Sequence, residues 1–248
     1  MAAIHNILAG SGSVFTFTFT IASDTSDYNL NTALLAAGWD GIAPVKGSVT
    51  INSSIVVSAS TTANAGFTTG ANFPLSSDIT LTNNGYIVGM GGKGGNGGGS
   101  GTSYATNGLP GGTGLAFSGN PSTSAKISLV NNGTIAGGGG GGGGAQSNAQ
   151  TYRGPGGGGG RTGRTNSAGG DTDYGSNPGT FSAPGAGLVP SGNGNSGSGG
   201  GWGSAGGEGS VWPGDYKASD GGAGGSSITG LSGFTYSSLG TLYGSTSG

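Results

Sequence analysis

Long glycine runs, three of which are interrupted at every third position by another residue, constrain the fold of this chain more than any other feature. In the first run the interrupting residues are Met90, Lys93 and Asn96, and the same spacing recurs in the last two runs. An extended left-handed helix of the polyproline II type has three residues per turn. Glycine on two of its three edges would let neighbouring helices approach closely. The main runs lie in residues 89–101, 137–144, 154–160, 199–209 and 221–225.

The backbone of such a run needs hydrogen-bond partners, because a polyproline II helix makes no internal bonds. Helices packed side by side can bond to one another, and this would offset the high entropic cost of ordering glycine. The alternative is a set of flexible Gly/Ser linkers. A linker needs no three-residue period, so the spacing favours an ordered polyglycine II bundle. Collagen is disfavoured, since glycine is not strictly periodic and only nine prolines are present.

The glycines divide the chain sharply. Only eight of the 64 glycines lie before residue 89. We therefore predict a β-rich attachment or oligomerisation domain in residues 1–88 and a glycine-rich receptor-binding domain in residues 89–248. The predicted fold class is mainly β and irregular, with one short helix in the first domain.

Local patterns support the β-rich assignment of the first part. Residues Val14–Ile21 alternate apolar and polar side chains, which is typical of a half-buried strand. A second strand is expected within residues 48–58, which are rich in β-branched residues. A short helix from Tyr28 to Ala37, capped by Ser26 or Asp27, would end at Gly38.

One unit occurs twice, 48 residues apart. Residues Ile79–Gly92 closely match Ile127–Gly140, and both contain Asn-Asn-Gly between two short apolar stretches. Asn-Gly favours a tight hairpin turn. The same supersecondary unit is therefore predicted to begin two glycine segments.

Aromatic and basic residues lie in the segments between the glycine runs, which we predict to form loops at the ends of rods. Loops on a rigid scaffold commonly carry binding functions, and tyrosine and tryptophan offer stiff contact surfaces. Basic residues there suit acidic lipopolysaccharide, although solvated loop charges are the simpler interpretation. The candidate binding residues are Tyr104, Phe117, Tyr152, Arg153, Arg161, Arg164, Tyr174, Phe181, Trp212 and Tyr216.

Several functions find little support in the sequence. Seven Lys and Arg residues in a chain of net charge −2 give no basic stripe for nucleic acid. One histidine and no cysteine make a nucleophilic triad improbable and remove thiolate metal ligands. Asp171 and Asp173 form an acid pair that fits a solvated loop better than a cation site. We expect no enzyme activity, cofactor, metal or membrane insertion.

Glycine runs of period three, separated by aromatic-bearing loops and preceded by a small β-rich part, resemble the distal adhesins of T-even-like bacteriophages. The resemblance is one of sequence pattern and covers roughly residues 79 to 225. It implies a polyglycine II sandwich, tip loops that bind a bacterial outer-membrane protein or surface glycan, and attachment to other tail-fibre proteins. It also implies a place in the virion tail tip after synthesis in the host cytoplasm, either as a homotrimer or as a single copy capping a trimeric fibre.

Two other functions remain open from the residues alone. An ice-binding protein can also fold as a polyglycine bundle, but it requires a flat face of short side chains that the unequal aromatic loops do not suggest. A purely structural glycine-rich virion component would tolerate exchange of the loops.

Overall fold

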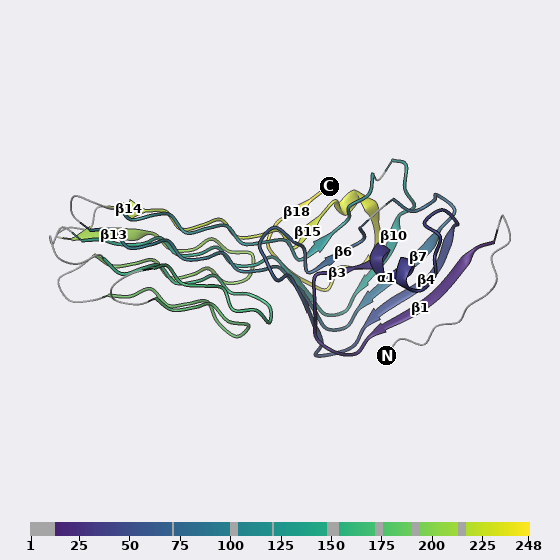
Figure 1. The fold of residues 1–248 in the computed structure, drawn as a ribbon, viewed down its shortest axis with the longest axis horizontal. Helices are drawn as coiled ribbons and strands as arrows, with labels where there is room; N and C mark the ends of the chain where they lie inside the picture. The colour runs from purple at the N-terminus through teal and green to yellow at the C-terminus, as the bar shows by residue number, and fades with distance from the viewer. Residues whose placement is uncertain are drawn as a thin grey trace.

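The protein is elongated, with a β-rich body at one end and a rod of extended, nearly parallel segments at the other (Figure 1). The computed structural model describes residues 13–70, 72–99, 104–120, 122–147, 154–171, 176–189, 194–212 and 217–248. Strand β1 (Phe15–Ile21) and the C-terminus both lie at the β-rich end, and the rod is built from segments between them (Figure 1).

Three five-stranded sheets form the β-rich body, and every neighbouring pair of strands within them is parallel. Sheet A contains β1 (Phe15–Ile21), β4 (Val45–Ile51), β7 (Asp78–Asn83), β10 (Ile127–Asn131) and β16 (Phe234–Ser238). Sheet B contains β2 (Thr25–Ser26), β5 (Val56–Ser58), β8 (Tyr86–Val88), β11 (Thr134–Ala136) and β17 (Thr241–Tyr243). Sheet C contains β3 (Tyr28–Asn29), β6 (Phe67–Thr68), β9 (Leu115–Ala116), β15 (Ile228–Thr229) and β18 (Thr246–Ser247).

The chain visits the three sheets in turn, so the body is a three-sided parallel β-solenoid, and each coil contributes one strand to each sheet. Its interior is filled by the inward-facing residues of the alternating strands. Phe19, Val49 and Leu81 form one such row across sheet A, with paired positions in neighbouring strands. The strand predicted at Val14–Ile21 is confirmed as β1, whose threonines face outward.

The 48-residue repeat corresponds to two consecutive coils. Ile127 pairs with Ile79 and Asn131 with Asn83, in register along β7 and β10. The predicted hairpin is wrong, because the strands before and after each Asn-Asn-Gly belong to different sheets and do not pair with each other. Asn-Asn-Gly is instead a solenoid corner. There the buried Asn83 donates from Nδ2 to Asn131 Oδ1 at 2.7 Å, so the turn is fixed by a stacked asparagine pair.

The remaining local predictions are partly confirmed. The short helix is α1 (Leu30–Ala36), but its cap is Asn29, whose Oδ1 accepts a hydrogen bond from Thr32 N at 3.1 Å. Gly38, with φ +98°, follows its end as expected. The single strand expected in residues 48–58 is divided between β4 and β5 on different sheets. A 3-10 helix, η1 (Leu231–Gly233), precedes β16.

The rod consists of two excursions from the solenoid. The first leaves after β8 and returns at β9, and the second leaves after β11 and returns at β15. Consequently the expected boundary at residue 88 marks only the first exit. Strands β9–β11 and β15–β18 lie beyond it and complete the solenoid sheets, because parallel coils pair strands that are far apart in the chain.

Hydrogen bonds between the rod segments recur at every third residue. Residues 137–145 form a central segment, whose main chain is buried throughout. Gly139, Gly142 and Ala145 donate to one neighbouring segment, at Arg161, Gly158 and Pro155, over 2.8–2.9 Å. Gly138, Gly141 and Gly144 donate to a second neighbour, at Gly112, Leu109 and Thr106. This is the period that a helix with three residues per turn requires. The handedness and rise expected for polyglycine II stay predictions.

The central segment also accepts hydrogen bonds from segments on its other sides. Gly92 and Gly95 donate to the carbonyls of Gly139 and Gly142, both at 2.8 Å, and Gly222 donates to Gly141. Such packing leaves no space for side chains, and we call this hydrogen-bonded array of rod segments the glycine lattice. An added Cβ at Gly140 would lie 1.9 Å from the carbonyl oxygen of Gly222. In the first run, as far as residue 99, the glycines are buried while Met90, Lys93 and Asn96 are partly exposed, as their spacing predicts.

Candidate functional site

The far end of the rod, opposite the solenoid, is the first candidate site, and we call it the tip. Small strands β12 (Gln146–Ser147), β13 (Gly209–Trp212) and β14 (Lys217–Ser219) form a three-stranded sheet there, at the end opposite the C-terminus (Figure 1). Segments 100–103, 148–153 and 213–216, which connect rod segments next to this sheet, lie outside the described residues.

Gln146 holds together the two chain ends that flank residues 100–103. Its Oε1 accepts from Ala105 N at 2.8 Å, and its Nε2 donates to the carbonyl of Gly99 at 2.9 Å. The next connection is held in a similar way, since Ser147 N and Gly154 N both donate to the carbonyl of Gly98. The bases of these two connections are therefore fixed by the rod.

Other connections at the tip are fixed by polar side chains, and two of these, Lys93 and Asn96, belong to the three-residue repeat. Asp171 N donates to Asn96 Oδ1 at 2.9 Å, and the Asp171 carboxylate forms an exposed ion pair with Lys93 at 3.2 Å. Asn195 N donates to Ser210 Oγ at 2.8 Å. A rigid base with short connections is the arrangement in which loops can present a binding surface.

The structure places only some of the predicted binding residues at the tip. Tyr104 lies where a rod segment begins, and 89% of its surface is exposed. Trp212 ends β13, and its side chain is outside the described residues. The other predicted binding residues that lie outside the described residues are Tyr152, Arg153, Tyr174 and Tyr216.

Three other predicted residues lie at the opposite end of the rod, where it joins the solenoid. Arg161 stacks over Trp202, with the guanidinium carbon 3.6 Å from the ring centre, and its Nε donates to the carbonyl of Phe181. Phe181 packs edge-to-face on Tyr86 of β8, with centroids 5.3 Å apart. Burial at this site lowers the pKa of the Arg161 guanidinium. These residues form a junction cluster that joins the rod to the solenoid.

Arg164 links the junction cluster to the first coil of the solenoid, which contains β1, β2 and β3. Its guanidinium lies 2.6 Å from the carboxylate of Asp24 and 5.7 Å from the ring centre of Phe181. Arg161 and Arg164, predicted to face a receptor, therefore make intramolecular contacts at the junction. Because these residues are far in sequence from their contact partners, a local sequence pattern could not predict this packing.

Phe117, also predicted to lie in an exposed loop, is a core residue of the solenoid. Only 7% of its surface is exposed, and it packs edge-to-face on Phe234 at 5.6 Å. It follows β9 directly, so the chain has already returned from the rod at this point. The tip residues that sequence reasoning missed are Gln146 and Asn96. Asn96 could have been found from the three-residue period, which places its side chain outside the lattice.

Among the described residues, no group of three or more His, Asp or Glu side chains could hold a metal ion. Within the same part of the chain, no helix is long and apolar enough to cross a membrane.

Comparisons with known proteins decide the family. A family model described as phage tail fibre adhesin Gp38 matches residues 16–247, which include both the solenoid and the rod. The chain belongs to this adhesin family. It is a receptor-binding component of a bacteriophage tail fibre, and membership places it in the tail of the virion. The family assignment favours the adhesin interpretation over the ice-binding and purely structural alternatives.

A solved structure has a similar fold. It is described as the crystal structure of the gp37-gp38 adhesin tip complex of the bacteriophage S16 long tail fiber. The match covers 92% of this chain and 81% of that chain, with a TM-score of 0.62 and 24% sequence identity. No curated protein matches the chain.

Proposed function

We propose that this adhesin binds a bacterial outer-membrane protein or surface polysaccharide through the loops at the rod tip. The observation that carries the proposal is that chain ends at the tip are held by hydrogen bonds with the side chains of Gln146 and Asn96, and by hydrogen bonds that the carbonyl of Gly98 accepts. A fixed base lowers the entropy that a loop loses on binding. Loop sequences can therefore vary while the scaffold stays constant.

The contact residues within this proposal are those near the tip. Tyr104, being almost fully exposed, is available as an aromatic anchor. The other proposed contacts are Tyr152, Arg153, Tyr174, Trp212 and Tyr216. Arg161, Arg164 and Phe181 are proposed to orient the rod, since their polar and aromatic groups contact the solenoid and each other. The proposed role is binding without catalysis.

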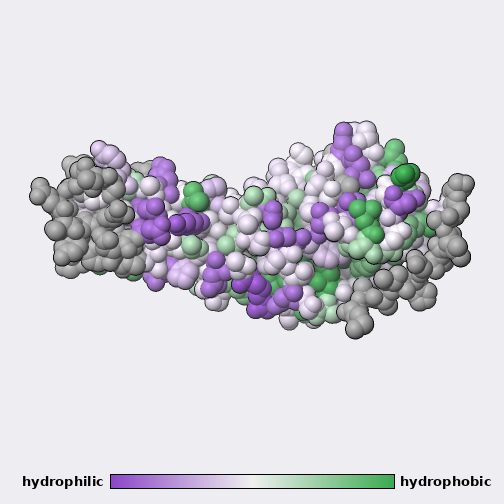
Figure 2. Space-filling view, viewed as in Figure 1, coloured by the Kyte–Doolittle hydropathy of each residue, from purple (hydrophilic) through white to green (hydrophobic). Residues whose placement is uncertain are grey.

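The solenoid end is proposed to attach to another tail-fibre protein. Strand β1 is the edge of sheet A. Beside it, a groove of about 320 Å³ is lined mainly by apolar side chains, including Phe19, Ile21 and Tyr28, together with alanines of α1. Figure 2 shows apolar surface gathered on this half of the molecule. The description of the S16 structure as a gp37-gp38 complex supports a fibre protein as the occupant.

A single copy capping a trimeric fibre is the stoichiometry that we propose. The central rod segment finds hydrogen-bond partners for its successive N–H groups within the same chain. The glycine lattice therefore needs no second copy to satisfy its buried backbone. Light scattering of the purified chain tests this proposal, and a stable trimer would contradict it. Synthesis in the host cytoplasm belongs to the same proposal.

Receptor binding is tested with purified protein on host cells, so that fibre attachment does not enter the measurement. Tyr104→Ala should weaken cell binding about tenfold or more, the effect of losing one aromatic anchor. Tyr236→Ala is the matched control, because Tyr236 is 53% exposed but lies on the solenoid. Exchange of residues 148–153 with the loop of a related phage should change host range. Unchanged host range after exchange of every tip loop would refute the assignment.

A further inference from the structure

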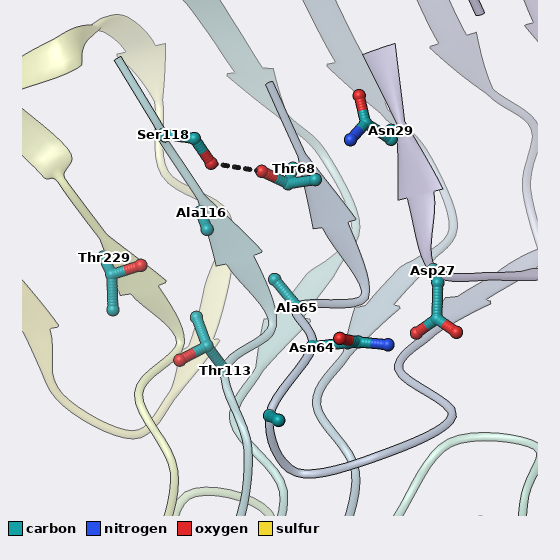
Figure 3. A pocket seen from close by; sticks show the side chains of 10 residues that line it. Asp27, Asn29, Asn64, Ala65, Thr68, Thr113, Ala116, Ser118 and Thr229 are labelled. Carbon is teal, nitrogen blue, oxygen red and sulfur yellow. Dashed lines mark hydrogen bonds between the residues drawn. The ribbon is translucent and has the colours of Figure 1, made fainter. Parts of the chain in front are cut away.

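A polar groove crosses the outer face of sheet C at the base of the rod, far from the tip. It has a volume of about 510 Å³ and spans strands β3, β6, β9 and β15. Figure 3 shows its lining side chains, with Asp27 and Asn29 at one end, Thr229 at the other, and Asn64 and Ala65 between them. Thr113, in the last residues of the first returning rod segment, closes the groove toward the rod. The volume is within the range of small-molecule sites.

Several polar groups in the groove have hydrogen-bonding capacity to spare. The hydroxyls of Thr113 and Thr229 and the side-chain amide of Asn64 form no hydrogen bond with any described residue. Asn29 uses Oδ1 to cap α1, which leaves its amide nitrogen as a donor. Thr68 and Ser118 share one hydrogen bond at 2.5 Å, so one of the two hydroxyl protons remains available.

One carboxylate gives the groove its charge. Asp27 Oδ1 accepts from Ser60 N at 2.9 Å, and Ser60 Oγ bonds the other carboxylate oxygen. A carboxylate offers about four acceptor positions, so two remain for a ligand. The lining contains no Lys or Arg that could neutralise an acidic ligand. The groove therefore disfavours phosphorylated or carboxylated molecules.

The apolar part of the lining is made of small groups only. Ala63, Ala65 and Ala116 contribute methyl groups between the hydroxyls and amides, together with the threonine methyls. The lining residues include no aromatic or long aliphatic side chain against which a large apolar anchor of a peptide could pack. A ligand that carries many hydroxyls on a thin apolar ring matches the alternation of donors, acceptors and methyl groups.

We propose that this groove is a second binding site, specific for neutral carbohydrate. Asp27 and Asn29 would bond ring hydroxyls at one end, while Thr113 and Thr229 would bond them at the other. The site is independent of the tip, because its residues lie on the solenoid or at the base of the rod. It would hold uncharged sugars of the cell surface while the tip engages its receptor.

The test uses immobilised neutral oligosaccharides of glucose, galactose and mannose, with sialylated and phosphorylated oligosaccharides as acidic probes. The Thr113→Val, Thr229→Val double variant keeps the side-chain shape and removes both hydroxyls. We expect wild type to bind at least one neutral probe and the double variant to bind it about tenfold more weakly, as two lost hydrogen bonds imply. Thr80→Val removes an outward hydroxyl from sheet A and should change nothing.

The outcomes separate this proposal from the tip proposal. Tyr104→Ala should leave neutral-sugar binding unchanged, and the double threonine variant should leave tip-dependent host range unchanged. Absence of binding to every neutral probe would overturn the inference. Equal binding by wild type and the double variant, or a preference for the acidic probes, would overturn it as well.

Discussion

Adding a single methyl group to a buried glycine of the glycine lattice should destabilise the protein. An ideal Cβ at Gly141 would lie 2.0 Å from the carbonyl oxygen of Lys93, a distance that real Cβ atoms do not show. The neighbouring backbone would have to move by about 1 Å. That movement would disturb the bond from Gly141 N to Leu109 O, at 2.9 Å, and the bond from Gly222 N to Gly141 O, at 2.7 Å.

Two disrupted buried hydrogen bonds cost about 2–5 kcal/mol, because their partners are left without water. Gly141→Ala should lower the free energy of unfolding by this amount. In a chain of this length each kcal/mol lowers Tm by about 2–4 °C. Scanning calorimetry of the purified protein measures the shift.

Gly201→Ala is the matched control within the same rod. An added Cβ there would meet nothing within 4 Å, and the residue has no positive φ. Alanine should therefore be neutral or stabilise by up to about 1 kcal/mol, by restricting the unfolded chain. Equal Tm values for the Gly141→Ala and Gly201→Ala variants would refute the argument that close backbone approach dictates glycine in the lattice.

Two further predictions concern the junction and the solenoid. Arg161→Met removes the stacking on Trp202 and should lower the free energy of unfolding by about 1–3 kcal/mol. Arg164→Met removes an exposed ion pair and should lower the free energy of unfolding by less than about 1 kcal/mol. A urea titration that ranks the two variants in the opposite order would contradict the assigned roles. Burial raises the pKa of Tyr28 to about 12, so its hydroxyl ionises at lower pH in the unfolded chain than in the folded one, and stability should fall as pH rises from 10 toward 12. Tyr28→Phe should reduce this loss of stability. An unchanged pH profile for the variant would show that another group causes the loss.

Sequence patterns identified the local elements of this fold well. The alternation in Val14–Ile21 predicted β1, and the 48-residue repeat predicted two equivalent units. The period of Met90, Lys93 and Asn96 indicated which edge of a rod segment faces outward. Each of these signals depends on residues close together in the chain, where side-chain direction follows directly from backbone period.

The long-range arrangement could not be predicted in the same way. Asn-Asn-Gly suits a hairpin as well as a solenoid corner, and only the pairing of β7 with β10 distinguishes them. Strands β15 and β18 are two residues long, too short for an alternating pattern. Arg161 and Phe181 looked like loop residues because their partner Trp202 is distant in sequence. Tertiary contacts, which local sequence patterns do not reveal, determine where these elements and side chains lie.

The two excursions of the chain from the solenoid have a kinetic consequence. Ile228 of β15 pairs with Leu115 of β9, although the whole second excursion lies between them in sequence. Contacts of such high sequence separation form slowly, since loop closure precedes the stabilising contacts. Opening that coil would disturb many interlocked hydrogen bonds at once, so unfolding should be slow as well. A virion outside its host has no chaperones to refold its proteins. An adhesin that unfolds slowly therefore keeps its tip intact until the virion meets a new host.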